Sequence, residues 1–276
     1  MTDSRIIVEP YGGLGNRIRA ICSSLWVRDL IKAPTLDIVW HENSELNIPF
    51  SNLFELPEQC RLIPFPGVTR SSFQTVAWRR WLAYFFNERI LPRYQVFKDK
   101  DLKFHWKNPV AFEQIFEEEN SYYFHTCEPF GNYKPYFSFL RPIQEIQEEV
   151  ESIISSLEDE GYFGVHIRRT DHVQAISKSS SLSFEERMEE ILMEDPNRKF
   201  FVTSDDPTEE SYFLKRFSGA VIVRKKEWSR VNHEGARDAL IDMLILARAT
   251  KILGSFNSSF SQIASDWGGV KLEVIQ

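Results

Sequence analysis

Apolar residues recur with two different periods along the second half of the chain. In some stretches they return every three or four residues, which predicts helices, and in others they form short runs rich in β-branched types, which predicts buried strands. The expected helices cover residues 143–157, 183–194, 207–216, 235–249 and 259–266, and the expected strands cover 163–167, 199–203, 220–223, 251–253 and 271–274. Because strands alternate with helices, we expect an α/β fold with a parallel, doubly wound sheet.

The beginning of the chain shows the same alternation, with a glycine-rich loop between its first two elements. A strand is expected at 6–9 and a helix after residue 16, with Ile18, Ile21, Leu25 and Leu30 on roughly one side, and the sequence PYGGLGN at 10–16 joins them. A second strand is expected at 36–40. Glycines let a backbone approach a ligand closely and turn its N–H groups toward an anion, to which a helix start adds partial positive charge. The spacing is neither GxGxxG nor that of a P-loop. A tight turn without a ligand is the alternative interpretation.

Residues 63–142 differ from both flanking regions, since they are rich in aromatic residues and proline and have little periodicity. Three interpretations are open. The aromatic side chains can fill the core of an irregular region, they can form an acceptor surface on which sugar rings stack, or residues 79–86, RRWLAYFF, can contact a membrane. The return of a regular pattern places a domain boundary near residue 140, so we expect domains at 1–140 and 141–276.

Composition excludes some classes of partner. The 276 residues carry a net charge of -7 with a pI near 5.5, and no basic face is evident, so a nucleic-acid partner is not expected. Cys22, Cys60 and Cys127 lack the spacing of a zinc site or a disulfide framework, which favours a reducing compartment. The N-terminus has no signal-peptide pattern and no stretch is apolar enough to span a bilayer, so we expect a cytoplasmic protein.

The densest group of polar residues follows the strand predicted at 163–167. In the sequence GVHIRRTD, which starts at Gly164, four ionisable residues lie within six positions: His166, Arg168, Arg169 and Asp171. Ligands of open α/β sheets bind at the carboxyl ends of the strands. Two arginines offer planar, permanently charged forks that suit a phosphate or a carboxylate. A surface cluster of salt bridges is the alternative interpretation.

Two further clusters lie where predicted strands end. Residues 203–207, TSDDP, close one strand and open a helix. Asp205 or Asp206 can cap that helix, which leaves the other carboxylate unexplained. Residues 254–259, GSFNSS, end another strand with hydroxyl groups and backbone donors at a helix start, which is a favourable cradle for an anion. The sequence therefore predicts several polar clusters on neighbouring strand ends.

Asp238 and Asp242 lie one turn apart on the helix predicted at 235–249. Like charges at this spacing destabilise a helix by roughly 0.3 kcal/mol unless a cation or a donor compensates them. Arg237 or Arg248 could supply that cation, which would make the pair purely structural. The alternative is that a carboxylate of this pair binds a ligand.

The motifs taken together resemble the fucosyltransferase superfamily, and most closely its α1,2-, α1,6- and protein-O-fucosyltransferase branch. They occur in the order GGLGNR at 12–17, HIRRTD at 166–171, TSDD at 203–206 and LIDMLILARA at 240–249, which runs into GSFNSS at 254–259. Residues 60–140 take no part in the resemblance. It implies a GT-B architecture with two Rossmann-like domains facing a cleft, GDP-fucose as the donor, inversion at the anomeric carbon, and no metal or other cofactor.

The resemblance also implies roles for individual residues. It assigns the β-phosphate of GDP to Arg168, and the guanine base or its ribose to His166 and Asp242. Ser258 and Ser259 would hold phosphate. The residues expected at the donor are Gly13, Leu14, Gly15 and Asn16 from the N-terminal domain, and His166, Arg168, Arg169, Asp205, Asp206, Asp242, Ser258 and Ser259 from the C-terminal domain. The acceptor, a glycan or another hydroxyl compound, is expected in the N-terminal domain.

Transfer of a sugar requires charge stabilisation and a proton acceptor. As the glycosyl phosphate bond breaks, negative charge builds up on the diphosphate, and arginine and N–H donors can stabilise it without a metal. The acceptor hydroxyl requires a general base. The carboxylate that follows HxRRTD in the α1,6-type enzymes has no counterpart in residues 172–184. We therefore expect Arg168 and Asp171 to be catalytic, with His172, Glu9 or no dedicated base as alternatives.

Two other functions stay open at this point. Arg168 would grip the diphosphate of any nucleotide sugar, so the donor could carry a sugar other than fucose. A chain without a base could also bind a nucleotide sugar and catalyse nothing.

Overall fold

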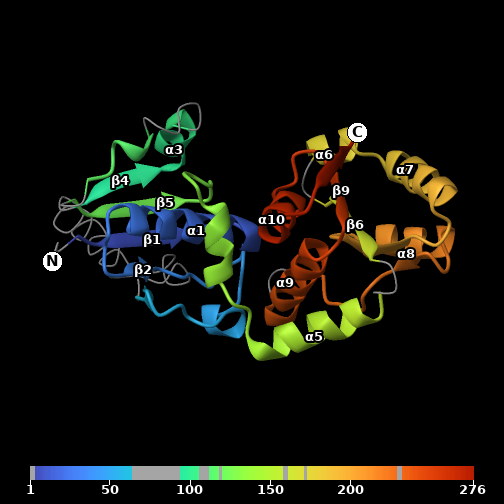
Figure 1. Cartoon of the computed structure of the whole chain (residues 1–276), viewed down its shortest axis with the longest axis horizontal. Helices are drawn as coiled ribbons and strands as arrows, with labels where there is room; N and C mark the ends of the chain where they lie inside the picture. The colour runs from blue at the N-terminus through green and yellow to red at the C-terminus, as the bar shows by residue number, and fades with distance from the viewer. Residues whose placement is uncertain are drawn as a thin grey trace. The chain divides into compact units, whose positions relative to one another are not determined.

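The computed structural model describes residues 4–63, 94–105, 112–117, 120–157, 161–170, 173–228 and 232–276. The chain divides into two compact units. Unit 1 contains Met1–Ile143 and Arg230–His233, and unit 2 contains Gln144–Ser229 and Glu234–Gln276. Each unit is built on one five-stranded sheet whose neighbouring strands are parallel (Figure 1). The α/β class that the sequence predicts is confirmed.

The sheet of unit 1 has the strand order β3-β2-β1-β5-β4. Its strands are β1 (Ile6–Pro10), β2 (Leu36–Ile38), β3 (Cys60–Leu62), β4 (Gln95–Lys98) and β5 (Tyr122–Thr126). The sequence predicts β1 and β2 but misses β3, β4 and β5. In β5 the buried residues Tyr122 and Phe124 alternate with the partly buried Tyr123 and His125. Because aromatic residues occupy both faces of this strand, the alternation cannot be recognised from residue types.

Helix α1 (Leu14–Leu30) follows the glycine-rich loop and packs on β1 (Figure 1). Its residues Ile18, Ile21 and Leu25 are buried, as their spacing predicts, whereas Leu30 at the end of the helix is exposed. Unit 1 also contains the helix α3 (Asp99–His105) and the 3-10 helices η1 (Phe50–Asn52) and η4 (Lys134–Phe139).

Aromatic residues of the middle region form a core cluster beside β5. Phe124 stacks on Phe130 with ring centroids 4.7 Å apart, and Phe112 packs edge-on against Phe116 at 5.0 Å. All four side chains are buried, so they fill a core. The segment 79–86, which could contact a membrane, lies outside the described residues. Within the described part of the chain, no helix combines the length and the apolar character needed to cross a bilayer.

The sheet of unit 2 has the strand order β10-β9-β6-β7-β8. Its strands are β6 (Tyr162–Ile167), β7 (Lys199–Ser204), β8 (Val221–Ile222), β9 (Lys251–Ser255) and β10 (Leu272–Ile275). Its helices are α5 (Gln144–Ser155), α6 (Val173–Lys178), α7 (Ser181–Glu194), α8 (Pro207–Arg216), α9 (His233–Ala247) and α10 (Ser259–Gly268). Every strand and helix expected after residue 143 is present, with ends that differ by a few residues, and α6 is an additional helix.

Strand β6 lies between β9 and β7, so the carboxyl ends of these three strands meet at one edge of the sheet. In the register of the sheet, His166 is paired with Thr203 on one side and with Gly254 on the other. Helix α9 approaches β6 closely at Gly164, where an added Cβ would lie 2.6 Å from the side chain of Leu246. This contact holds α9 against the strand that precedes the HIRRTD motif.

Candidate functional site

Arg168 stands at the carboxyl end of β6, where the chain leaves the sheet. Its backbone N–H donates to the hydroxyl of Ser255 at 2.9 Å, which ties the turn after β6 to the end of β9. Its guanidinium Nη1 lies 3.1 Å from Oδ2 of Asp205, at the end of β7. The side chain of Arg168 is 18% exposed, so a charged group lies at the surface of this edge.

Asp205 and Asp206 divide two tasks between them. Asp206 caps α8 and accepts from the backbone N–H of Thr208 at 2.8 Å. Asp205 instead accepts from the N–H of Arg169 at 2.7 Å and from the hydroxyl of Thr170 at 2.6 Å. Burial would raise the pKa of Asp205, but the Thr170 hydrogen bond and the charge of Arg168 lower it below its ordinary value. Asp205 is therefore ionised and holds the turn that carries Arg168.

Arg169 is directed into the interior of unit 2. Its Nε donates to Glu209 at 2.9 Å, its Nη1 to the carbonyl of Ser179 at 3.0 Å, and its Nη2 to the hydroxyl of Ser181 at 3.0 Å. The residue is buried. The two adjacent arginines of the motif thus have different roles. Arg169 hydrogen-bonds to the loop before α7, and Arg168 lies at the sheet edge.

His166 is buried directly beneath this edge. Its ring stacks on that of Phe260 with centroids 4.7 Å apart, and its Nδ1 lies 3.4 Å from the hydroxyl of Ser258. Burial lowers the pKa of His166 to about 3, although the charge of Asp205 opposes the change. The imidazole is therefore neutral at pH 7, with one nitrogen that donates and one that accepts.

The loop after β9 leads into the start of α10, where donor groups are available for an anion. Asn257 adopts a left-handed conformation with φ of 53°, which turns the chain into the helix. Ser258 is the N-cap residue, yet its side chain makes no capping hydrogen bond within the described structure, unlike Ser180 at α7 and Asp206 at α8. The first-turn N–H groups of α10 and the exposed Ser259 consequently face the same edge as Arg168 with the donors that a phosphate requires.

Asp242 lies on α9 and is engaged by groups of the protein itself. Its Oδ2 accepts from Lys226 Nζ at 2.5 Å and from the hydroxyl of Thr203 at 2.6 Å, and its Oδ1 accepts from Arg224 Nε at 3.1 Å. Arg224 also pairs with Asp238 at 2.8 Å. Burial would raise the pKa of Asp242, but the charges of Lys226 and Arg224 lower it. Two buried cations on the segment after β8 thus neutralise the carboxylates of α9.

The expectation that Arg237 or Arg248 compensates this pair of carboxylates is wrong. Arg237 pairs with Glu149 at 2.8 Å and Arg248 with Glu151 at 2.8 Å, both on α5. Local spacing favours cations on the same helix, whereas the compensating cations come from a different element. No signal in the sequence singles out residues 224 and 226.

The glycine-rich loop of unit 1 has an open backbone at the start of α1. Gly12 has a φ of +82°, which an L side chain rarely adopts, and a Cβ added at the N-cap residue Gly13 would meet no atom within 4 Å. Gly13 offers α1 no side-chain cap. Asn16 Oδ1 is buried and lacks a hydrogen-bond partner among the described residues. Leu14 is buried in the core, so its backbone alone can face a ligand.

Arg17 holds this loop in place and was not assigned a role by the sequence. Its side chain is fully buried. Nε donates to the carbonyl of Gly12 at 2.8 Å, Nη2 donates to Asn43 at 3.0 Å, and Nη1 donates to the carbonyl of His41. The last residue of the GGLGNR motif therefore connects the glycine turn to the loop after β2.

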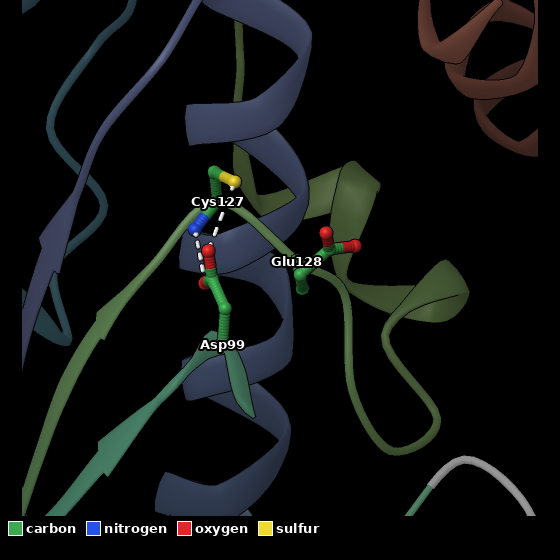
Figure 2. Close-up of side chains that lie close together, drawn as sticks. All are labelled: Asp99, Cys127 and Glu128. Carbon is green, nitrogen blue, oxygen red and sulfur yellow. Dashed lines mark hydrogen bonds between the residues drawn. The ribbon is translucent and has the colours of Figure 1, made fainter. Parts of the chain in front are cut away.

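One group of side chains in unit 1 has the composition of a metal site. Asp99, Cys127 and Glu128 offer ligand atoms within 4.8 Å of one another (Figure 2). The thiol of Cys127 donates to Asp99 at 3.4 Å, and burial raises its pKa to about 11. Glu128 already pairs with Lys103 at 3.0 Å and with Arg19 at 3.7 Å. These contacts identify a hydrogen-bonded and ion-paired group.

The structure brings the predicted donor residues of unit 2 to one sheet edge: His166, Arg168, Asp205, Ser258 and Ser259, with Asp242 joined to that edge through Thr203. Gly13 to Asn16 belong to unit 1. Asp171 and His172, two of the candidate bases, lie outside the described residues.

Comparisons with known proteins give the family and the fold. The family model for GDP-fucose protein O-fucosyltransferase matches residues 6–266. No curated protein matches the chain by sequence. The structure of the fucosyltransferase NodZ from Bradyrhizobium is similar with a TM-score of 0.59 and 18% identity over 95% of this chain and 92% of NodZ. POFUT1 in complex with GDP-fucose has a TM-score of 0.58 and 14% identity over 100% and 99% of the two chains.

A third similar structure, a point mutant of Arabidopsis thaliana FUT1 in complex with GDP, has a TM-score of 0.64 and 13% identity over 99% of this chain and 71% of FUT1. These fucosyltransferases share the fold of the chain, and the expected GT-B class with two parallel sheets is confirmed. The family model covers nearly the whole sequence. The chain therefore belongs to the GDP-fucose protein O-fucosyltransferase family.

Proposed function

We propose that this glycosyltransferase takes fucose from GDP-fucose, binds GDP at the β9-β6-β7 edge of unit 2, and transfers the sugar with inversion to a hydroxyl of a glycan or another acceptor. Family membership supports the fucosyltransferase class. The observation that carries the assignment of the edge is the juxtaposition of Arg168, held by Asp205, with the uncapped start of α10. Both features are suited to a diphosphate.

Charge stabilisation on the leaving group is the main task of this edge. When the bond from fucose C1 to the β-phosphate oxygen breaks, its electron pair stays on GDP. Arg168 is already oriented by Asp205 and by the Ser255 contact of its backbone, so little reorganisation is needed as the charge develops. The first-turn N–H groups of α10, with Ser258 and Ser259, would add neutral donors to the same phosphates.

Three residues that the sequence predicts at the donor, Arg169, Asp205 and Asp206, are assigned structural roles in this proposal. Asp205 carries a negative charge that would repel a phosphate in direct contact, so we assign it to positioning Arg168. Asp206 is a helix cap and Arg169 is a buried brace. His166, neutral and stacked on Phe260, keeps its expected contact with the base or its ribose, because a neutral imidazole can donate to or accept from either.

The role of Asp242 in guanine recognition is the least direct of the predicted roles. A carboxylate could accept from guanine N1–H and from the exocyclic amine at once. Asp242 is buried and holds Lys226, Arg224 and Thr203. We propose that it acts on the base site by fixing the segment after β8, and that a direct contact with guanine uses only the remaining acceptor capacity of Oδ1.

A metal is not part of the proposed mechanism. Arg168 and N–H donors stabilise the diphosphate. In the Asp99, Cys127 and Glu128 group, the thiol donates to Asp99, and Glu128 pairs with Lys103 and Arg19. Three free cysteines support the further proposal that the protein works in a reducing, cytoplasmic compartment.

Arg168→Lys should lower kcat for GDP release from GDP-fucose by about 10²- to 10³-fold, because lysine cannot reproduce the planar fork at the leaving group. Steady-state kinetics with a matched circular dichroism spectrum would measure it. Arg187→Lys is the control, since Arg187 pairs with Glu273 on the surface of the same unit. Turnover like that of the wild type in the Arg168 variant would contradict the role.

GDP should bind at least about tenfold more tightly than UDP, a difference of roughly 1.4 kcal/mol. Guanine presents two neighbouring donors that uracil lacks, and a site with acceptors for them rejects the smaller base. Isothermal titration calorimetry with GDP, UDP and dTDP measures the preference on the unmodified chain. Equal affinities would remove the support for GDP-fucose and favour another nucleotide sugar, and absence of all binding would favour neither.

Asp242→Asn should destabilise the protein by about 3–5 kcal/mol at pH 7, because it leaves Lys226 and Arg224 buried with less compensating charge. Since the pKa of Asp242 is lowered on folding, the stabilisation is present above its ordinary pKa of about 4 and is lost as the pH falls. Denaturant unfolding at pH 7 and pH 3 should therefore show a difference that shrinks in acid. Asp206→Asn is the control, since asparagine caps a helix as well as aspartate.

Excess EDTA should leave the rate of GDP release from GDP-fucose within about twofold of the untreated rate, because the charge stabilisation proposed here comes from arginine and N–H donors. The measurement compares chelated protein with protein supplied with Mg²⁺ or Mn²⁺. Complete loss on chelation, reversed by either ion, would show that the reaction depends on a metal.

A further inference from the structure

A buried serine connects the two loops of unit 2 that we assign to the diphosphate. Ser179 follows α6 and is completely buried. Its carbonyl accepts from Arg169 Nη1 at 3.0 Å, and its hydroxyl oxygen lies 2.7 Å from the backbone nitrogen of Phe256. Arg169 belongs to the HIRRTD turn, and Phe256 belongs to the loop between β9 and α10. Ser179 is not among the donor residues that the sequence predicts.

The hydroxyl of Ser179 has a fixed direction. Its proton is donated to the carbonyl of Ile275 at the end of β10, at 2.6 Å, because a carbonyl oxygen can only accept. The hydroxyl oxygen is therefore left to accept from the N–H of Phe256. A side chain without a hydroxyl would remove a hydrogen-bond partner from both of these backbone groups, and water has no access to replace a side chain that is completely buried.

Phe256 lies inside the turn that carries the chain from β9 into α10. The N–H of Ser258 closes this turn on the carbonyl of Ser255 at 3.3 Å, and Asn257 has the left-handed φ of 53°. The hydroxyl of Ser255 accepts from the backbone N–H of Arg168. The hydrogen bond at Phe256 therefore fixes the turn between the residue that contacts Arg168 and the N-cap residue of α10.

The residues on either side of Ser179 contact the same two loops. Lys178, the last residue of α6, places its ammonium group 4.0 Å from the ring centroid of Phe256. Arg169 Nη2 donates to the hydroxyl of Ser181 at 3.0 Å. Helix α6 packs beside β9 (Figure 1). The segment 178–181 thus binds the arginine turn on one side and the loop before α10 on the other.

We propose that Ser179 is a positioning residue for the transfer, which holds the start of α10 in the orientation that binds the diphosphate of the donor. The proposal rests on the fucosyltransferase function proposed above. Because Ser179 is completely buried, it acts through Phe256 and not by touching the ligand. Donors that are already oriented stabilise a developing charge with little reorganisation. Ser179 supplies that orientation to the first-turn N–H groups of α10, as Asp205 does to Arg168.

Ser179→Ala should weaken the binding of GDP by about tenfold, because the first turn of α10 is no longer held for the diphosphate. The affinity for guanosine, which lacks both phosphates, should stay within about twofold of the wild-type value. Calorimetry measures both ligands at one salt concentration. Ser265→Ala is the matched control, since Ser265 is a buried serine near the other end of α10 whose hydroxyl donates to the carbonyl of Val270 at 2.6 Å. The control should keep the wild-type affinity for GDP.

The ratio of the two affinities separates a positioning role from a merely structural one. If Ser179→Ala weakened GDP and guanosine equally, or changed neither, the proposal would be overturned. Equal weakening of GDP binding by Ser265→Ala would also overturn it, because any lost buried hydrogen bond would then have the same effect. Failure of the wild type to bind GDP would instead overturn the proposed function.

Amide hydrogen exchange tests the proposal on the unmodified chain, whatever the stability of the variant. Without ligand, the N–H of Phe256 should exchange slowly, because it is bound to a buried hydroxyl. The first-turn N–H groups of α10 should exchange faster and become protected when GDP is added. Nuclear magnetic resonance resolves these amides individually. If the Phe256 amide exchanged as fast as that of an exposed loop, or became protected only with GDP, the turn would not be preformed and the proposal would fail.

Discussion

The donor edge of unit 2 depends on the carboxylate of Asp205. It accepts hydrogen bonds from Arg169 and Thr170 and forms the ion pair that orients Arg168, so the turn after β6 takes its conformation from a residue that follows β7. This is possible because β6 and β7 end in register, with Ile167 beside Ser204. A shift of one residue in that pairing would move Asp205 out of reach and turn alternate side chains to the other face. The register of the sheet therefore decides whether a phosphate-binding arginine is held or left mobile.

Buried charge gives the same edge its second support. Lys226 is almost completely buried and contacts Asp242 and Glu210, both at 2.5 Å, while Arg224 joins Asp242 to Asp238. Charges removed from water are costly, and a network of this kind is tolerated only when each member finds oppositely charged partners. Strand β8 is only two residues long, and residues 223–228 after it form neither helix nor strand, so few backbone hydrogen bonds fix this segment. The ion pairs to α9 supply that constraint, and they explain how two carboxylates one turn apart on α9 are tolerated.

Sequence reasoning succeeds where one local rule decides the structure. The alternating elements of unit 2, the cap at Asp206 and the clustering of polar groups on β6, β7 and β9 all follow from period, capping chemistry and parallel topology. It fails where partners are distant or types are ambiguous. Nothing local distinguishes the buried Arg169 from the partly exposed Arg168, or singles out Arg224 and Lys226 as partners of Asp242. Strand β5 is missed because aromatic residues lie on both of its faces. The placement of His125 beside Glu9 is missed as well, because it depends on the register of β1 and β5.

The charges around His166 decide whether this residue can accept a proton. His166 is fully buried, and the positive charges of Arg168 and Lys226 add to the effect of burial, so its pKa falls to about 3 and it stays neutral through the reaction. The positive charge of Arg168, which favours a bound diphosphate, also disfavours a second positive charge on the neighbouring imidazole. His166 is therefore a weak base.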